Sequence, residues 1–284
     1  MSAVARPPIR ILGLCGFSQN KHVMHQRLGF LRKALKQQVE FDFVDPPFVI
    51  EKVDYATGNT KFADFDSETT MDENMTPETT PRAWFRSKDE EVNGKTIKTY
   101  IGLDQALADL HKYLIEQETP FDAVFGFSQG ACMAALLTAL LERPGLHPSF
   151  PAHPKLKPLK YCVSVGGFVC GDEAYSNFYP IATPTLHIVG VNDTIVTPER
   201  SQTLIRVCDD ARVEKHDGSH FIPSKANWKN FFVAYLTSFT DEGLQGDVPG
   251  PSSQQGGAAS TTASANTTRP GTPEVTAGEE KSAL

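Results

Sequence analysis

The sequence has no paired cysteine motif, and this absence bears on the compartment in which the protein works. Its five cysteines form no C-x-x-C pair and are odd in number: Cys15, Cys132, Cys162, Cys170 and Cys208. A disulfide framework is therefore not expected, and a reducing compartment, the cytoplasm, is the simpler prediction.

Other absences argue against a secretory signal, a membrane span, nucleic-acid binding, a cofactor and a metal site. The first ten residues, MSAVARPPIR, contain no apolar core of a secretory signal, and the longest apolar run is too short to span a bilayer. The net charge is −7 and the basic residues are scattered, so nucleic acid is not an expected partner. No P-loop or dinucleotide fingerprint is present, and His22 and His25 lack further ligands that would complete a metal site. Neither a cofactor nor a metal is predicted.

The chain does contain one stretch with a clear chemical signature, Phe121 to Leu141. A short apolar strand is followed by the turn Gly126-Phe127-Ser128-Gln129-Gly130 and then by a helix rich in alanine and leucine. This is the G-x-S-x-G pattern of a nucleophile elbow, with the required strand before and helix after it. A serine at the tip of so sharp a turn has a strained backbone, so the residues two before and two after it must lack bulk. Gly126 and Gly130 meet that need.

Apolar strands alternate with amphipathic helices along most of the chain. Strands are predicted at 9–15, 39–44, 122–125, 160–165, 184–189 and 212–215, and helices from Asn20 or Lys21 onward and at 102–117, 198–208 and 223–239. The alternation predicts an α/β fold in which a mostly parallel sheet has helices on both faces. Ligands of such sheets bind at the carboxyl ends of the strands.

Two segments depart from this alternation. Residues 48–100 are rich in Asp, Glu and Thr, and are predicted to form a lid-like insertion with little structure of its own. A solvated acidic loop without a role remains the alternative for 64–78. Residues 241–284 contain no aromatic residue and are predicted to be a disordered tail. The resulting organisation is a flexible N-terminus at 1–8, one folded domain at 9–240 and the tail.

A serine nucleophile needs a histidine base, which is itself oriented by a carboxylate. In the order Ser, Asp, His, Ser128 is followed by Asp193, directly after a strand, and by His220, in a loop between strand and helix. These three residues form the predicted triad. His216, at the end of a strand, is the competing base, whereas His187 lies within a strand. The other downstream acids are Asp172, Asp209, Asp210 and Asp217.

The tetrahedral intermediate of such a reaction needs two N–H donors, an oxyanion hole. One is predicted to be the backbone N–H of Gln129, the residue after the nucleophile, and the other that of Phe17 in the loop after the first strand. The side chain of Gln19 is a candidate to brace that loop. An apolar acyl pocket is predicted around Phe127, Trp84, Phe85 and Phe221.

Several motifs together resemble the FSH family of serine hydrolases, whose relatives include ovarian-tumour-associated hydrolases of animals and thioesterases that release fungal polyketides. They are Cys15-Gly16-Phe17-Ser18-Gln19, Arg82-Ala83-Trp84-Phe85, Gly126 to Gly130, Asn192-Asp193 and Gly218 to Pro223. The resemblance covers about 9–240. It implies an α/β-hydrolase fold and a Ser128–Asp193–His220 triad acting on esters or thioesters. One departure is Cys15, where many members have a histidine.

The expected activity is hydrolysis of a small carboxylic ester or acyl thioester with an apolar acyl chain, through an acyl-enzyme. Two alternatives stay open. A thioesterase that releases an acyl or polyketide product from an acyl carrier would use the same residues, and a binding protein would keep the fold without turnover.

Overall fold

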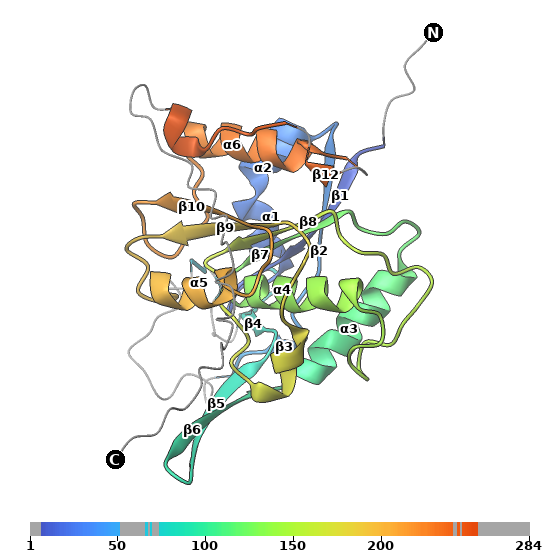
Figure 1. Cartoon of the computed structure of the whole chain (residues 1–284), viewed down its shortest axis with the longest axis vertical. Helices are drawn as coiled ribbons and strands as arrows, with labels where there is room; N and C mark the ends of the chain where they lie inside the picture. The colour runs from blue at the N-terminus through green and yellow to red at the C-terminus, as the bar shows by residue number, and fades with distance from the viewer. Residues whose placement is uncertain are drawn as a thin grey trace, which may run out of the picture.

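A six-stranded parallel sheet forms the centre of the computed structural model, which describes residues 7–51, 66–67, 69, 74–240, 243–244 and 246–254. The strand order is β10-β9-β8-β7-β1-β2 (Figure 1). These strands are β1 (Ile9–Leu14), β2 (Val39–Phe43), β7 (Ala123–Phe127), β8 (Tyr161–Val165), β9 (Thr185–Gly190) and β10 (Ala211–His216). Each neighbouring pair runs parallel, as the alternation of strands and helices predicts.

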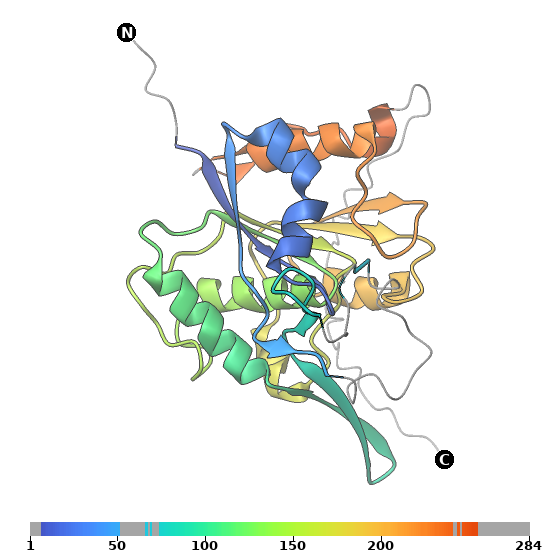
Figure 2. The same cartoon turned by 180° about the vertical axis from the view of Figure 1, so that it is seen from behind.

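Helices cover both faces of the sheet, because its inner strands β7, β8 and β9 are buried on both sides. In β1, Ile11 belongs to one core cluster and the adjacent Leu12 to the other. One face carries α3 (Leu103–Glu116), α4 (Gln129–Glu142) and α5 (Pro198–Ile205). The opposite face carries α1 (Lys21–Arg27), α2 (Gly29–Leu35) and α6 (Ala226–Thr237), as Figures 1 and 2 show. In the part of the chain described here, no helix is both long and apolar enough to cross a bilayer.

Element boundaries differ from the predictions in two places. The helix expected from Asn20 is divided at Leu28, which ends α1 and begins α2, although the apolar spacing continues across the break. The Asn20 side chain accepts a hydrogen bond from the Val23 N–H at 2.9 Å and so caps α1. Strand β7 runs through Gly126 and Phe127, so the turn is confined to Ser128 and α4 starts at once.

The expectation of little structure in residues 48–100 is wrong for the described part after residue 74. Strands β5 (Arg86–Val92) and β6 (Lys95–Ile101) form an antiparallel hairpin that projects from the body of the molecule (Figure 1). Its turn, Asn93-Gly94, has positive φ at both residues, which is the geometry that Asn-Gly favours in two-residue hairpins. Strand β3 (Phe48–Val49) pairs with β4 (Arg82–Ala83). Residues 52–65, 68 and 70–73, with much of the acidic stretch, lie outside the described residues.

Ordered structure also continues past the predicted tail boundary at residue 241. Strand β11 (Phe239–Thr240) pairs with β12 (Gly243–Leu244), and a short 3-10 helix η4 (Pro251–Gln254) follows. The Val248 side chain is buried in the core cluster of α6, and its carbonyl accepts a hydrogen bond from Arg212 at 2.7 Å. A few apolar residues therefore anchor a segment whose average composition is that of a tail. Residues 1–6 and 255–284 lie outside the described residues.

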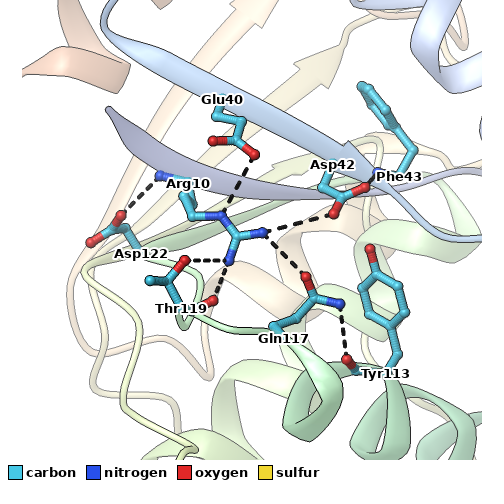
Figure 3. Close-up of polar contacts among 8 residues, drawn as sticks. All are labelled: Arg10, Glu40, Asp42, Phe43, Tyr113, Gln117, Thr119 and Asp122. Carbon is cyan, nitrogen blue, oxygen red and sulfur yellow. Dashed lines mark hydrogen bonds and ion pairs between the residues drawn. The ribbon is translucent and has the colours of Figure 1, made fainter. Parts of the chain in front are cut away.

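A polar cluster joins elements at the amino ends of the strands (Figure 3). The Arg10 backbone N–H donates to Asp122 Oδ2 at 2.8 Å, and its guanidinium lies 4.4 Å from the centre of the Phe121 ring. The other partners of this guanidinium are Glu40, Asp42, Gln117 and Thr119. We call these residues the Arg10 cluster. It ties β1 and β2 to the connection between α3 and β7, at the edge of the sheet opposite Ser128.

Candidate active site

Ser128 lies at the tip of the sharp turn between β7 and α4. Its backbone has φ 54° and ψ −118°, a conformation that side chains rarely adopt and that costs about 1–3 kcal/mol. A Cβ on Gly126 would lie 2.4 Å from the Gly130 carbonyl oxygen, and one on Gly130 would lie 2.1 Å from that of Leu14. Only glycine fits at either position, as the steric argument from the sequence requires.

The structure brings Ser128, His220 and Asp193 into direct contact. His220 Nε2 lies 2.8 Å from Ser128 Oγ, and His220 Nδ1 lies 2.6 Å from Asp193 Oδ2. All three side chains are buried. Since an ionised carboxylate only accepts hydrogen bonds, Nδ1 carries the proton toward Asp193 and Nε2 is left to accept the serine proton. This is the arrangement in which an imidazole acts as base toward a hydroxyl.

The second oxygen of Asp193 is also fully engaged. Its Oδ1 accepts hydrogen bonds from the backbone N–H groups of Ile195 and Val196, both at 2.9 Å. These bonds come from the loop between β9 and α5, so the carboxylate is fixed by backbone rather than by mobile side chains. Held in this way, Asp193 presents Oδ2 to the His220 Nδ1–H and keeps the imidazole in one tautomer.

The competing residues lie elsewhere. His216 packs against the rings of Phe221 and Trp228, and its Nδ1 accepts the Gly218 N–H at 3.2 Å. Burial lowers the His216 pKa. His187 is buried within β9, where burial lowers its pKa to about 4. Neither histidine is among the partners of Ser128.

The loop after β1 is braced by Gln19, as the sequence suggested. The Gln19 Oε1 accepts the Gly16 N–H at 3.0 Å, and its Nε2 donates to the Asp66 carbonyl at 2.8 Å. Ser18 has φ 63°, so the chain turns sharply directly after Phe17. Phe17, Ser128 and Gln129 then line one cavity together.

The side chain of Gln129 acts as a clamp between segments, a role that no sequence motif indicates. Its Oε1 accepts the Trp84 N–H at 2.8 Å and its Nε2 donates to the Phe85 carbonyl at 2.9 Å. The Trp84 indole N–H donates in turn to the Cys15 carbonyl at 2.9 Å. The start of α4, the segment before β5 and the loop after β1 are thereby locked together around Ser128.

A cavity of about 500 Å³ opens beside Ser128. Its apolar wall is formed by Phe17, Phe85, Tyr100, Phe168, Ile195 and Val196. Of the residues predicted for the acyl pocket, Phe85 lines this cavity. Trp84 and Phe127 are buried and do not line it. The Phe127 ring lies 4.8 Å from that of His220, and Phe221 lines a different hollow. Tyr100 and Phe168 also line the cavity beside Ser128, although no sequence motif marks either residue.

Within the described ranges, no group of three or more His, Cys, Asp or Glu side chains is placed to hold a metal ion.

The chain is similar to several known proteins. A family model described as "Serine hydrolase (FSH1)" matches residues 1–232. The Schizosaccharomyces pombe protein named dihydrofolate reductase is 32% identical over 237 residues, which are 81% of this chain and 47% of that protein. This chain therefore spans about half the length of that relative. Esterase OVCA2 of Danio rerio is 30% identical over 245 residues, 84% of this chain and 100% of that protein.

Among solved structures, acyl-protein thioesterase 2 of Zea mays superimposes with a TM-score of 0.54. The sequences are 16% identical, and the match covers 82% of this chain and 95% of that one. At this identity the likeness concerns the fold alone. The architecture is the α/β-hydrolase fold.

Proposed function

We propose that this chain, which belongs to the serine hydrolase (FSH1) family, cleaves carboxylic esters or acyl thioesters at Ser128. The observation that carries the proposal is the continuous contact from Ser128 Oγ through His220 to Asp193. The name of one relative, an esterase of Danio rerio, supports an ester substrate. A structure of the same fold, from Zea mays, is named as an acyl-protein thioesterase, so the fold is compatible with thioester substrates as well.

In the proposed mechanism, Ser128 Oγ attacks the carbonyl carbon while His220 Nε2 takes its proton. His220 then gives that proton to the leaving alcohol or thiol, which departs from the tetrahedral intermediate and leaves an acyl-enzyme. Water attacks the acyl-enzyme in the same way, with His220 again as base. Asp193 holds the imidazole in the productive tautomer and stabilises it while it is positively charged.

The proposed oxyanion hole consists of the backbone N–H groups of Gln129 and Phe17. Gln129 is the first residue of α4, and the first N–H groups of a helix have no acceptor within it, so they are directed at the site. The positive end of the α4 dipole favours a developing oxyanion at the same place. The hydrogen bonds of the Gln129 side chain to Trp84 and Phe85 hold the start of α4 in place. The bond from the Gly16 N–H to Gln19 does the same for the loop that contains Phe17.

The apolar wall of the cavity suits an acyl chain, and its volume is in the range of small-molecule sites. We also infer a hydrolase domain at 9–240 with the β12–η4 segment packed on it, and a cytoplasmic location. Five buried cysteines, all free, support a reducing compartment.

The test is hydrolysis of p-nitrophenyl esters of increasing chain length by the wild type and by Ser128→Ala. We expect the variant to lose about 10⁴- to 10⁶-fold in kcat with no loss of folded protein, as for removal of other triad nucleophiles. Retention of wild-type turnover by a folded Ser128→Ala variant would refute the proposal.

A further inference from the structure

The cavity beside Ser128 has a second character, because one part of its lining is basic. Its charged lining residues are Arg86, Lys88 and Lys98 on the β5–β6 hairpin and Arg200 on α5. Within the described chain, no aspartate or glutamate lines it. The protein as a whole carries a net charge of −7, so the sign of this lining is opposite to that of the molecule. A basic hollow in an acidic protein attracts anions selectively.

Two of these cations are already paired outside the cavity. Lys88 Nζ lies 2.5 Å from Glu90 and Lys98 Nζ lies 2.5 Å from Asp89. The carboxylates in both pairs are half exposed, so solvent screens the pairs and they contribute little. Both ammonium groups can therefore turn toward a ligand without a large loss.

Arg200 is differently placed. Its Nη1 donates to the Ile195 carbonyl at 3.0 Å, and its guanidinium carbon lies 4.6 Å from the centre of the Phe168 ring. These contacts orient the guanidinium between two residues of the cavity wall. Among the described residues it has no carboxylate partner within ion-pair distance. A guanidinium has five N–H donors and binds carboxylate or phosphate in two-point fashion, so donors remain for an anion.

We propose that this enzyme selects esters or thioesters that carry an anion, carboxylate or phosphate, several bonds from the reacting carbonyl, and that Arg200 binds that anion. The inference rests on the proposed function, since it concerns the same cavity. The apolar wall contacts the neutral part of the substrate, and Arg200 with the hairpin cations contacts the charged end. Such an anion reaches the cavity from either of two sources: the far end of the acyl chain or the leaving group.

Four probes with the same six-carbon acyl chain separate these sources. The first pair is p-nitrophenyl hydrogen adipate and p-nitrophenyl hexanoate, which differ in a terminal carboxylate on the acyl chain. The second pair is hexanoyl-coenzyme A and hexanoyl-N-acetylcysteamine; the second leaving group is a truncated coenzyme A that lacks all of its phosphates, together with its nucleoside and pantoyl parts. For each pair we would measure the ratio of kcat/KM for the anionic probe to that for the neutral one, in wild type and Arg200→Gln.

We expect Arg200→Gln to lower this ratio about 10- to 100-fold in at least one pair, the effect of losing a charged hydrogen bond to an anion. The loss should lie in KM, because the anion is remote from the reacting atoms, and it should shrink as salt is raised. Arg200→Lys should restore part of the ratio. Arg206→Gln, on the exposed end of the same helix and outside the cavity lining, is the matched control and should leave the ratio unchanged.

The pair that responds identifies the source of the anion. Because Arg200 contacts the Ile195 carbonyl and the Ile195 N–H binds Asp193, its replacement can lower activity on every substrate, and the ratio cancels that effect. Unchanged ratios in both pairs, with neutral probes still hydrolysed, would overturn this inference and leave the proposed function intact. Hydrolysis of none of the four probes by the wild type would overturn both.

Discussion

The polar groups at the two ends of the central strands, called here the carboxyl edge and the amino edge of the sheet, differ in their exposure to solvent. At the carboxyl edge, Ser128, Asp193 and His220 are 3%, 4% and 4% exposed, and every hydrogen-bonding atom of the Asp193 carboxylate has a partner. At the amino edge, the side chains that pair with Arg10 are 56% exposed for Glu40 and 38% for Asp42. Buried contacts are strong and fixed because water does not compete, whereas exposed ion pairs contribute about 0–1 kcal/mol. Solvent exposure, rather than the number of charges, therefore decides how strongly the side chains of a polar cluster hold one another.

Among the changes at the carboxyl edge, Asp193→Asn should have the largest effect on activity. An amide in place of the carboxylate no longer requires the His220 tautomer that accepts the serine proton, so we expect kcat to fall about 10⁴-fold. Steady-state hydrolysis of a p-nitrophenyl ester measures it. Asp217→Asn is the matched control, because Asp217 lies in the loop near His220 but makes no hydrogen bond to it in the described structure; this variant should keep kcat within about threefold of wild type. A fall of the same size in both variants would contradict the assignment.

Gln129→Ala tests whether the carboxyl edge also depends on its supporting clamp. The change leaves the Trp84 N–H and the Phe85 carbonyl buried without their present partners, so we expect a loss of about 3–4 kcal/mol in the free energy of unfolding. Urea denaturation of the variant measures it. Gln105→Ala removes an exposed glutamine that bonds only Asp109 on its own helix, and it should cost less than about 0.5 kcal/mol. Equal costs for the two glutamines would count against the clamp.

His187, inside the sheet between the two edges, gives a prediction for pH. Burial lowers its pKa to about 4, while in the unfolded chain it titrates near its ordinary value of about 6.5. The unfolded state therefore binds more protons between these values. The contribution of His187 to the free energy of unfolding is complete above pH 6.5 and falls as the pH drops toward 4. The loss over that window is about 3 kcal/mol.

Unfolding free energies of the wild type and His187→Gln between pH 7 and pH 4 isolate this contribution, since other groups titrate in both proteins. As the pH falls, the wild type should lose more unfolding free energy than His187→Gln. If the two curves of unfolding free energy against pH run parallel, His187 has the same pKa in the folded and unfolded states, which would contradict the prediction.

Arg10→Met breaks the amino edge and should have the smallest effect. The methylene stem still covers Phe121, and the lost ion pairs are exposed, so we expect a loss of about 1 kcal/mol in the free energy of unfolding. That difference should fall with added salt, and kcat should stay at the wild-type level. A tenfold fall in kcat would show that the two edges are not independent.

Much of the fold could be predicted because its signals are local. The inner strands of the parallel sheet are short, mostly apolar runs, and the G-x-S-x-G turn fixes its own geometry through Gly126 and Gly130. The Ser, Asp, His order along the chain predicts the triad Ser128, Asp193 and His220, and the structure places these three residues in contact. Their catalytic role remains a prediction.

The parts that escaped prediction depend on distant partners or on solvent. The strand Arg86–Val92 is polar or charged at nearly every position, so it shows no alternation, and only the Asn93-Gly94 turn signals the hairpin. The Gln129 side chain binds a residue 45 positions earlier in the chain, which no local pattern encodes. Likewise, Phe127 and Phe221 are neighbours of Ser128 and His220 in sequence, yet neither lines the cavity beside Ser128.

The most direct test of the central claim is covalent labelling by a fluorophosphonate, read by intact mass and by peptide mapping. Such a reagent reacts with a serine that a neighbouring base activates. We predict one adduct per chain, on Ser128, which is absent in Ser128→Ala and forms much more slowly in Asp193→Asn. An adduct that persists in Ser128→Ala, or a folded wild type that takes up no label, would contradict the account.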